Sequence, residues 1–439
     1  MSIKLGMISL GCAKNLVDGE HMLAQLADAG VTIVDDVAEA DVAVVNTCGF
    51  IESAKQEAIN TILETAQLKQ TGSLKALIVT GCLVQRYPKE IVEELPEIDA
   101  VLGTGSYTSI VDAVRAVMQA PGTVYQNFGQ INEAEMEGGR ILLTPGYSAY
   151  LKIAEGCDNH CAYCVIPSLR GKFRSRAMED VLKEAQALAD AGVRELIIVA
   201  QDITRYGMDL YHEHKLSELL HELCKMDFTW VRLHYLYPDE ITDDMIETIA
   251  QEPKIVKYLD IPIQHVNNRI LRAMHRRGDA QFLRELFHKL RREIPGLVLR
   301  TSLIVGLPGE TDEEFEELCD FLREMRIERA GVFCYSPEEG SEAAEMPDQI
   351  DEELKNERRM IIEELQSDVL DQFAARMQGQ LLDVLCEGWD GETGLYYGRS
   401  YADSQDIDAR VLFDSAFSVE EGDFVPVRIT GAQGADLTG

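Results

Sequence analysis

The first third of the chain alternates short β-branched runs with longer amphipathic stretches. The apolar runs predict strands at Lys4–Leu10, Asp41–Asn46 and Lys75–Thr80. Apolar residues at helical spacing predict helices near Val17–Ala29, Ser53–Leu68 and Ser109–Met118. Strands alternating with helices indicate βαβ units, so residues 1–118 should form an open parallel α/β sheet domain. Residues 119–147 are rich in Gly, Asn, Glu and Thr and are interpreted as a linker that could include a strand or two leading into the next domain.

The same alternation resumes near Ala149 and continues for almost two hundred residues. Strands are predicted at Tyr150–Glu155, Glu195–Ala200, Val231–Tyr235, Tyr258–Ile261, Leu297–Val305 and Ala330–Tyr335. Thr311 and Glu314 have the spacing of a capping box at the start of a helix. Six βα units over residues 148–375 predict a partial barrel, whose working face lies at the carboxyl ends of its strands.

The pattern changes again after a long helix predicted at Asp351–Met377. Residues 376–439 are rich in Val, Tyr, Phe and Gly and predict about five short strands, a small β-barrel of the oligonucleotide-binding kind. This segment has four basic and twelve acidic residues, a net charge of −8. Because neutralised phosphates supply most of the affinity for RNA, this domain should repel RNA and attract a basic protein.

The composition of the whole chain also favours a basic protein over RNA as the partner. Of the 439 residues, 46% are hydrophobic, and the net charge of −35 favours a basic partner over nucleic acid, although solubility alone explains much of it. No run approaches the length of a membrane span. Ten cysteines in a chain of this length, without a secretion signal, indicate reduced thiols and the cytoplasm.

One cysteine cluster lies in the stretch GCDNHCAYCVIPSLRGKFRSR, which follows the first predicted barrel strand. Its cysteines, Cys157, Cys161 and Cys164, can turn toward one point from a single tight loop. Three thiolates suit an iron–sulfur cubane that keeps one iron open for another ligand. The alternative is a zinc loop, which needs a fourth ligand such as His160 or a distant cysteine.

A second set of cysteines follows the three amino-terminal strands. Each strand runs into a cysteine beside glycine, LGC at Cys12, TCG at Cys48 and TGC at Cys82. These are equivalent positions at the carboxyl ends of parallel strands, where open α/β sheets gather ligands. The alternative is that they are buried core thiols. That interpretation is preferred for the four remaining cysteines, Cys224, Cys319, Cys334 and Cys386, which lack metal-site spacing.

Longer strings around these cysteines resemble a known family. The string GCDNHCAYC followed by IPSLRGKFRSR resembles the radical S-adenosylmethionine (SAM) enzymes, and among them the methylthiotransferases of the RimO type. The strings SLGCAKNLVD, VVNTCGFI and VTGCLVQRY are similar to the amino-terminal domain of that family, and the last segment resembles its TRAM domain by position. Gly19 departs from the family, which usually has serine in an Asp-Ser-Glu run.

The resemblance implies a chemistry and its cofactors. The Cys157, Cys161 and Cys164 site would hold a 4Fe-4S cluster that cleaves SAM to a 5′-deoxyadenosyl radical. That radical would remove a hydrogen from the β-carbon of an aspartate in the decoding-centre protein of the small ribosomal subunit. A second, auxiliary 4Fe-4S cluster on Cys12, Cys48 and Cys82 would present sulfur, and a second SAM would supply the methyl group. The resemblance also implies an electron donor and a sulfur donor.

Two other functions remain as alternatives. The first is methylthiolation of an adenosine in transfer RNA, against which the acidic carboxyl-terminal domain and the LRGKFRSR string both count. The second is a non-enzymatic iron–sulfur carrier or scaffold, although carriers usually close the fourth ligand position.

Two further sets of residues are candidates for binding. Gln201 and Asp202 after the second barrel strand, and Gly306 and Gly309 after the fifth, could contact SAM or be ordinary turn residues. The basic run could hold a carboxylate of SAM or of the substrate aspartate, or form a solvated turn. Its members are Arg170, Lys172, Arg174 and Arg176.

Overall fold

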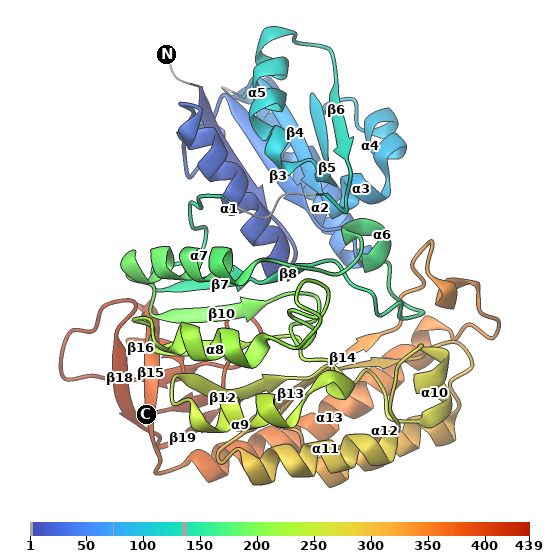
Figure 1. Cartoon of the computed structure of the whole chain (residues 1–439), viewed down its shortest axis with the longest axis vertical. Coiled ribbons are helices and arrows are strands. Elements are labelled where there is room, and N and C mark those ends of the chain that lie inside the picture. Colours follow the sequence, from blue (N-terminus) through green and yellow to red (C-terminus); the bar gives the residue numbers. More distant parts are fainter. Residues whose placement is uncertain (1–2, 73, 134–137) are drawn as a thin grey trace.

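The computed structural model describes residues 3–72, 74–133 and 138–439, which form three domains (Figure 1). Each domain is built on a six-stranded sheet. In Figure 1 the amino-terminal domain lies above the central domain, and the carboxyl-terminal domain, in red, lies beside the lower part of the central domain. None of the helices in the described ranges is both long enough and apolar enough to cross a bilayer.

The amino-terminal sheet is entirely parallel, in the order β2-β1-β3-β4-β5-β6. Its strands are β1 (Lys4–Ser9), β2 (Thr32–Ile33), β3 (Val42–Thr47), β4 (Ala76–Gly81), β5 (Ala100–Gly105) and β6 (Tyr125–Gly129). Every residue of β3 and β4 is buried, because helices cover both faces of the sheet. One face carries α1 (Ala13–Asp28) and α5 (Ile110–Gln119), and the other carries α2 (Glu52–Thr71), α3 (Cys82–Arg86) and α4 (Pro88–Glu94).

Strand β6 lies within the segment predicted as a linker, 119–147. It pairs in parallel with β5, so the amino-terminal sheet extends to Gly129 rather than ending near residue 118. The sequence gives little sign of this strand because an edge strand buries few side chains, and none of the five residues of β6 is fully buried.

The central domain is an open parallel sheet in the order β14-β13-β12-β11-β10-β7. Neighbouring strands are consecutive βα units, as expected of a partial barrel. The strands are β7 (Ser148–Lys152), β10 (Glu195–Val199), β11 (Trp230–Leu233), β12 (Ile255–Asp260), β13 (Val298–Val305) and β14 (Arg329–Cys334). The helices are α6 (Ile166–Arg170), α7 (Met178–Asp190), α8 (Leu216–Cys224), α9 (Asp243–Gln251), α10 (Asn268–Ala273), α11 (Ala280–Glu293), α12 (Asp312–Met325) and α13 (Glu352–Met377). Short 3-10 helices occur at Val37–Glu39, Tyr107–Ser109, Pro238–Glu240 and Glu342–Glu345.

All six predicted barrel strands are present, with ends shifted by a few residues, and the capping box at Thr311 and Glu314 is confirmed. The strand predicted at Tyr150–Glu155 is divided. It leaves the sheet after Lys152, and Ala154–Glu155 forms β8, which pairs antiparallel with β9 (Arg174–Ser175). This small ribbon forms the base of the loop that carries Cys157, Cys161 and Cys164.

The carboxyl-terminal domain has six strands, one more than expected, in the order β18-β15-β16-β17-β20-β19. They are β15 (Leu381–Asp390), β16 (Leu395–Arg399), β17 (Val411–Phe413), β18 (Phe424–Arg428), β19 (Gly431–Gln433) and β20 (Asp436–Thr438). Their core includes Trp230 and Val298, the first residues of β11 and β13. This domain therefore packs at the amino ends of the barrel strands, opposite the face that carries the cysteines.

Candidate active site

The central cysteine loop presents its sulfurs to hydrogen-bond donors. The backbone N–H of Asn159 donates to Cys157 Sγ at 3.4 Å, and that of Ile166 donates to Cys164 Sγ at 3.4 Å. The hydroxyl of Tyr237 lies 3.6 Å from Cys161 Sγ. Donors of this kind stabilise thiolates and tune iron–sulfur clusters. Burial raises the pKa of Cys157 to about 11 and of Cys164 to about 12, so metal ligation would have to displace their protons.

The amino-terminal cysteines lie at the ends of three adjacent strands, β1, β3 and β4. Cys12 precedes α1, Cys48 follows β3, and Cys82 opens α3. Glycine allows the loops to approach closely. A Cβ on Gly11, which has φ +87°, would lie 2.6 Å from Cys48 Cβ, and one on Gly49 would lie 2.7 Å from Leu83 Cα.

These three thiols differ in their electrostatic environment. Burial raises the pKa of Cys82 to about 12 and also raises that of Cys48. Desolvation of the Cys12 thiol opposes its ionisation. The positive charges of Lys14 and Arg170 have the larger effect and lower the pKa of Cys12. Cys12 is also exposed to solvent, whereas Cys82 is buried.

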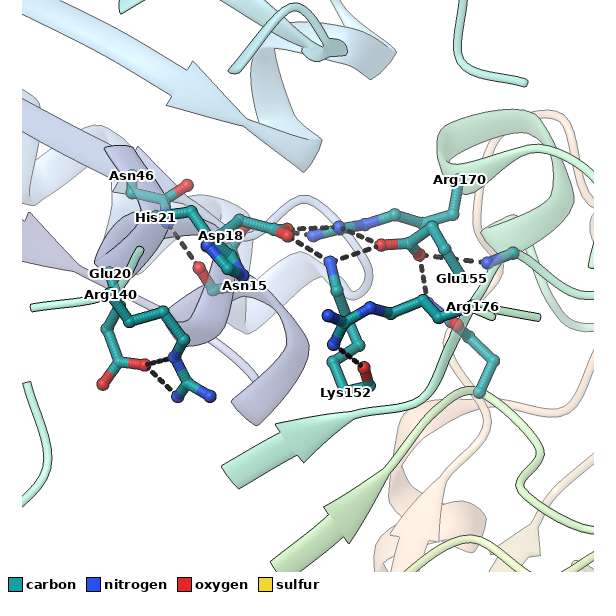
Figure 2. Close-up of polar contacts among 12 residues, drawn as sticks. Asn15, Asp18, Glu20, His21, Asn46, Arg140, Lys152, Glu155, Arg170 and Arg176 are labelled. Carbon is teal, nitrogen blue, oxygen red and sulfur yellow. Dashed lines mark hydrogen bonds and ion pairs between the residues drawn. The ribbon is translucent and has the colours of Figure 1, made fainter. Parts of the chain in front are cut away.

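A buried ion network joins the two cysteine-bearing domains (Figure 2). Asp18 of α1 accepts hydrogen bonds from both Lys152 and Arg170 of the central domain. Glu155 completes the network, 2.9 Å from Lys152 Nζ and 3.2 Å from Arg170 Nη1. Arg170 also donates to Asn15 Oδ1 at 3.1 Å. The network lies between the two cysteine sets, since Asp18 follows Cys12 on α1 and Arg170 ends the helix after Cys164.

A cavity of about 750 Å³ lies between the amino-terminal and central domains and is lined by residues that neighbour both cysteine sets in the sequence. Phe50, two residues after Cys48, lines it from the amino-terminal domain, and Tyr163, next to Cys164, lines it from the central loop. The carboxyl ends of β13 and β14 form much of the remaining wall, including Ile304, Phe333 and Cys334, and the loop after β14 and the start of α13 also contribute. Its volume is within the range of ligand sites. Cys334 is therefore partly exposed at the cavity and not a core residue, whereas Cys224, Cys319 and Cys386 are buried as expected.

The four residues considered for SAM have clear local partners. Gln201 Nε2 donates to Glu155 Oε1 at 2.9 Å, while Gln201 Oε1 is buried and has no partner within the described residues. Asp202 accepts from Asn159 at 3.1 Å and so braces the cysteine loop. A Cβ on Gly306 would collide with Lys355 of α13, and Gly309 accepts from Arg269 through its carbonyl.

The basic run does not act as one cationic patch. Arg170 and Arg176 are buried and paired with carboxylates of the chain, Arg176 with Glu184 at 2.7 Å, so these two are occupied by internal ion pairs. Lys172 is exposed. Arg174 is half-buried, and its Nη2 is buried without a hydrogen-bond partner within the described residues.

The spacing of the cysteines bears on the choice between zinc and an iron–sulfur cluster. Within the described part of the chain, no three Cys, His, Asp or Glu side chains converge closely enough to hold one metal ion. A structural zinc site brings four ligands to about 2.0–2.3 Å from one ion. The three thiolates of each set are too few to close such a site, whereas three suit a cubane cluster that keeps one iron open.

Sequence reasoning missed several residues of this site. Asp18, Glu155 and Tyr237 carry no metal-site spacing, and their partners are distant in the sequence. The available signal for Asp18 was its place beside Gly19 in the family string. The available signal for Glu155 was a carboxylate at the end of an apolar strand.

Comparison with known proteins first defines the class. Family models match at residues 4–103 (uncharacterized protein family UPF0004), 151–322 (Radical SAM superfamily) and 379–439 (TRAM domain). The fold is similar to that of the radical SAM methyltransferase TsrM from Kitasatospora setae, with a TM-score of 0.58 at 15% identity over 89% of this chain and 79% of that chain. The chain is thus a three-domain radical-SAM protein.

Its relatives identify the family. Proteins named ribosomal protein uS12 methylthiotransferase RimO are 51% identical in Pelotomaculum thermopropionicum, over 100% of this chain and 99% of the relative, and 49% identical in Geobacter sulfurreducens, over 99% and 98%. The relative of that name in Clostridioides difficile is 46% identical over 100% of this chain and 98% of its own length. The chain belongs to the RimO family.

Proposed function

We propose that this protein is a radical-SAM methylthiotransferase that adds a methylthio group to the β-carbon of an aspartate in ribosomal protein uS12. The observation that carries the proposal is that one interdomain cavity is lined by a sequence neighbour of each cysteine set, Phe50 near Cys48 and Tyr163 next to Cys164. A reaction that joins a radical at a carbon atom with a sulfur donor needs both sources at one substrate. The names of the relatives agree with this activity.

We assign one 4Fe-4S cluster to each cysteine set, on Cys157, Cys161 and Cys164, and on Cys12, Cys48 and Cys82. When bound, the clusters and SAM supply the electron, the radical and the sulfur that an unreactive carbon–hydrogen bond requires. The chain itself contributes donors to the sulfurs and a buried ion network that holds the two sites together. Ten free cysteines suit the reducing cytoplasm, where we place the reaction, with separate electron and sulfur donors.

Binding roles can be divided among the remaining candidates. Gln201 is the best placed for SAM, because its buried Oε1 needs a donor. Asp202, Gly306 and Gly309 would act indirectly, by bracing the cysteine loop and the loop after β13. Arg174 has an unpartnered Nη2 and is the preferred anchor for a carboxylate of SAM or substrate, with Lys172 at the surface beside it.

The charge distribution supports a protein substrate. Of the four arginines in residues 376–439, Arg399 is buried on Glu195, and Arg376 pairs with Glu328 at 3.3 Å. Asp403 and Glu387 of the same domain are likewise paired, with Arg329 and Arg399 at 2.7 Å each, so the surface of this domain keeps the acidic balance that its composition indicates. Such a surface repels phosphate and favours a basic ribosomal protein.

The test offers two substrates in parallel to anaerobically reconstituted enzyme with SAM, sulfide and reductant. Mass spectrometry should find a methylthio group on an aspartate of uS12 and none on transfer RNA. Cys157→Ala should abolish the product, whereas Cys319→Ala, which changes a buried core thiol, should retain it. Modification of transfer RNA would overturn the substrate assignment alone, and failure to cleave SAM would favour the iron–sulfur carrier.

A further inference from the structure

Buried cations divide into two groups according to their partners. Ten lysine and arginine residues are buried within the described ranges. Eight of them pair with a carboxylate within 4.0 Å, namely Lys152, Arg170, Arg176, Arg232, Arg329, Lys355, Arg358 and Arg399. The other two, Lys14 and Arg276, have no carboxylate partner among the described residues. Each of these two lies at a different cysteine set.

Arg276 lies against the central cysteine loop. Its Nη1 is 3.9 Å from Cys161 Sγ and 3.4 Å from the hydroxyl of Tyr163. Its guanidinium lies over the ring of Tyr237, 4.2 Å from the centroid, and Nη2 donates to the Pro262 carbonyl at 2.5 Å. These contacts orient the guanidinium, and the Arg276 side chain is only 7% exposed. Asp239 is close enough to interact with Arg276 electrostatically, but that carboxylate is already bound by Arg277 at 2.7 Å.

Lys14 lies beside the amino-terminal cysteines. It follows Cys12 by two residues and is 8% exposed. Its ammonium lies over the ring of Tyr235, 3.7 Å from the centroid, in a cation–π contact between the two domains. Asp260 is close enough to interact with Lys14 electrostatically, but that carboxylate is already bound by Arg300 at 2.7 Å.

One short segment after β11 contacts both cations through the rings of two tyrosines. Tyr235 and Tyr237 both follow β11, and Tyr235 has a positive φ of +66°, in the left-handed region that non-glycine residues seldom adopt. The segment therefore turns between the two tyrosines and supports a cation at each cysteine set. A buried charge without an ionic partner costs several kcal/mol, so this arrangement indicates that an anion belongs at each place.

We propose that Lys14 and Arg276 are the counter-cations of two anionic clusters, one at each cysteine set, and that each sets how readily its cluster accepts an electron. The inference rests on the proposed function, because it needs clusters on these cysteines. Reduction adds one electron from an external low-potential donor to a cluster, with no bond formed or broken. A fixed positive charge stabilises the reduced cluster more than the oxidised one and so raises its reduction potential.

The test measures midpoint potentials in full-length protein that retains one cysteine set. In the C12A/C48A/C82A background, only the central site can hold a cluster. After anaerobic reconstitution, a potentiometric titration followed by electron paramagnetic resonance, without SAM, should show that Arg276→Met reduces the equilibrium constant for reduction at least tenfold, which is about 59 mV for one electron. Arg276→Lys should retain most of the potential, and Lys14→Met in this background should leave it unchanged.

The complementary experiment uses the C157A/C161A/C164A background, in which only the amino-terminal site can hold a cluster. Here Lys14→Met should lower the midpoint potential of that cluster and Arg276→Met should not. Equal potentials in loaded Met variants and their parents would overturn the inference while leaving the proposed function intact. Loss of iron in a Met variant that the Lys or Arg replacement restores would support the role of charge. Equal loss in both replacements would show a packing role and overturn it. Parents that bind no cluster would overturn the proposed function as well.

Discussion

The interdomain ion network makes a prediction about Asp18. In the structure its carboxylate contacts two buried cations, Lys152 and Arg170, and among the described residues Glu155 is the one other carboxylate that pairs with them. Asp18→Asn preserves the shape of the side chain but leaves two buried cations with one carboxylate. All four side chains are no more than 5% exposed, so solvent cannot replace the missing charge.

The magnitude follows from the cost of breaking a buried ion pair by removing one partner, about 3–5 kcal/mol. Because urea unfolding has slopes of about 1–3 kcal/mol per molar for small proteins and more for larger ones, the first unfolding midpoint should fall by about 1 M. The matched control is Asp112→Asn in the same domain. Asp112 pairs with Arg115 at 3.6 Å in the open, with the side chains 70% and 61% exposed, a geometry worth about 0–1 kcal/mol.

Circular dichroism during urea titration of both variants would provide the comparison. Asp18→Asn should unfold well before the parent, and Asp112→Asn should be nearly indistinguishable from it. The same variant should also lower methylthiolation of uS12, because the network holds the two cysteine sets in register. If Asp18→Asn unfolds like the Asp112→Asn control, the network is not what joins the domains.

Three further predictions concern other parts of the chain. Burial favours the protonated form of Glu195, but Arg399 and Arg232 hold its pKa at about 2. The ionised carboxylate therefore contributes about 3 kcal/mol to the free energy of unfolding. This contribution is complete above pH 4.5 and is lost as the pH falls toward 2. Glu195→Gln should accordingly be less stable than the parent at pH 7, and a gap that persists at pH 2 would contradict this. Thr311→Ala should cost about 1 kcal/mol in thermal unfolding, with recovery in Thr311→Ser, because the capping box is lost. Arg174→Gln should lower kcat/KM by about tenfold or more, and unchanged SAM cleavage and substrate modification would reject the anchor.

Local features of the sequence predicted three of the six amino-terminal strands, all six barrel strands and the placement of the cysteines, but strands β2 and β5 were missed. Cys12, Cys48 and Cys82 each follow an apolar run and lie next to a glycine, and the parallel topology places the ends of these runs side by side. The capping box at Thr311 is equally local, since both partners lie within one turn. Edge strands were harder to predict. The sequence leaves room for a strand or two in the linker but does not locate β6, whose burial is incomplete.

The partner of each charged side chain was decided only by the tertiary structure. Arg170 and Arg174 look alike in the string LRGKFRSR. Arg170 is buried and paired with Asp18, whereas Nη2 of Arg174 has no hydrogen-bond partner among the described residues. Lys14 and Arg276 are unremarkable in sequence and distinctive only because no carboxylate meets them in the described fold. Hydrophobic periodicity depends on residues that are close together in the sequence, so it can be recognised without the structure. The pairing of buried charges depends on contacts between residues from different elements, such as Asp18 and Arg170, which are 152 positions apart, and the sequence alone does not show which of those residues meet.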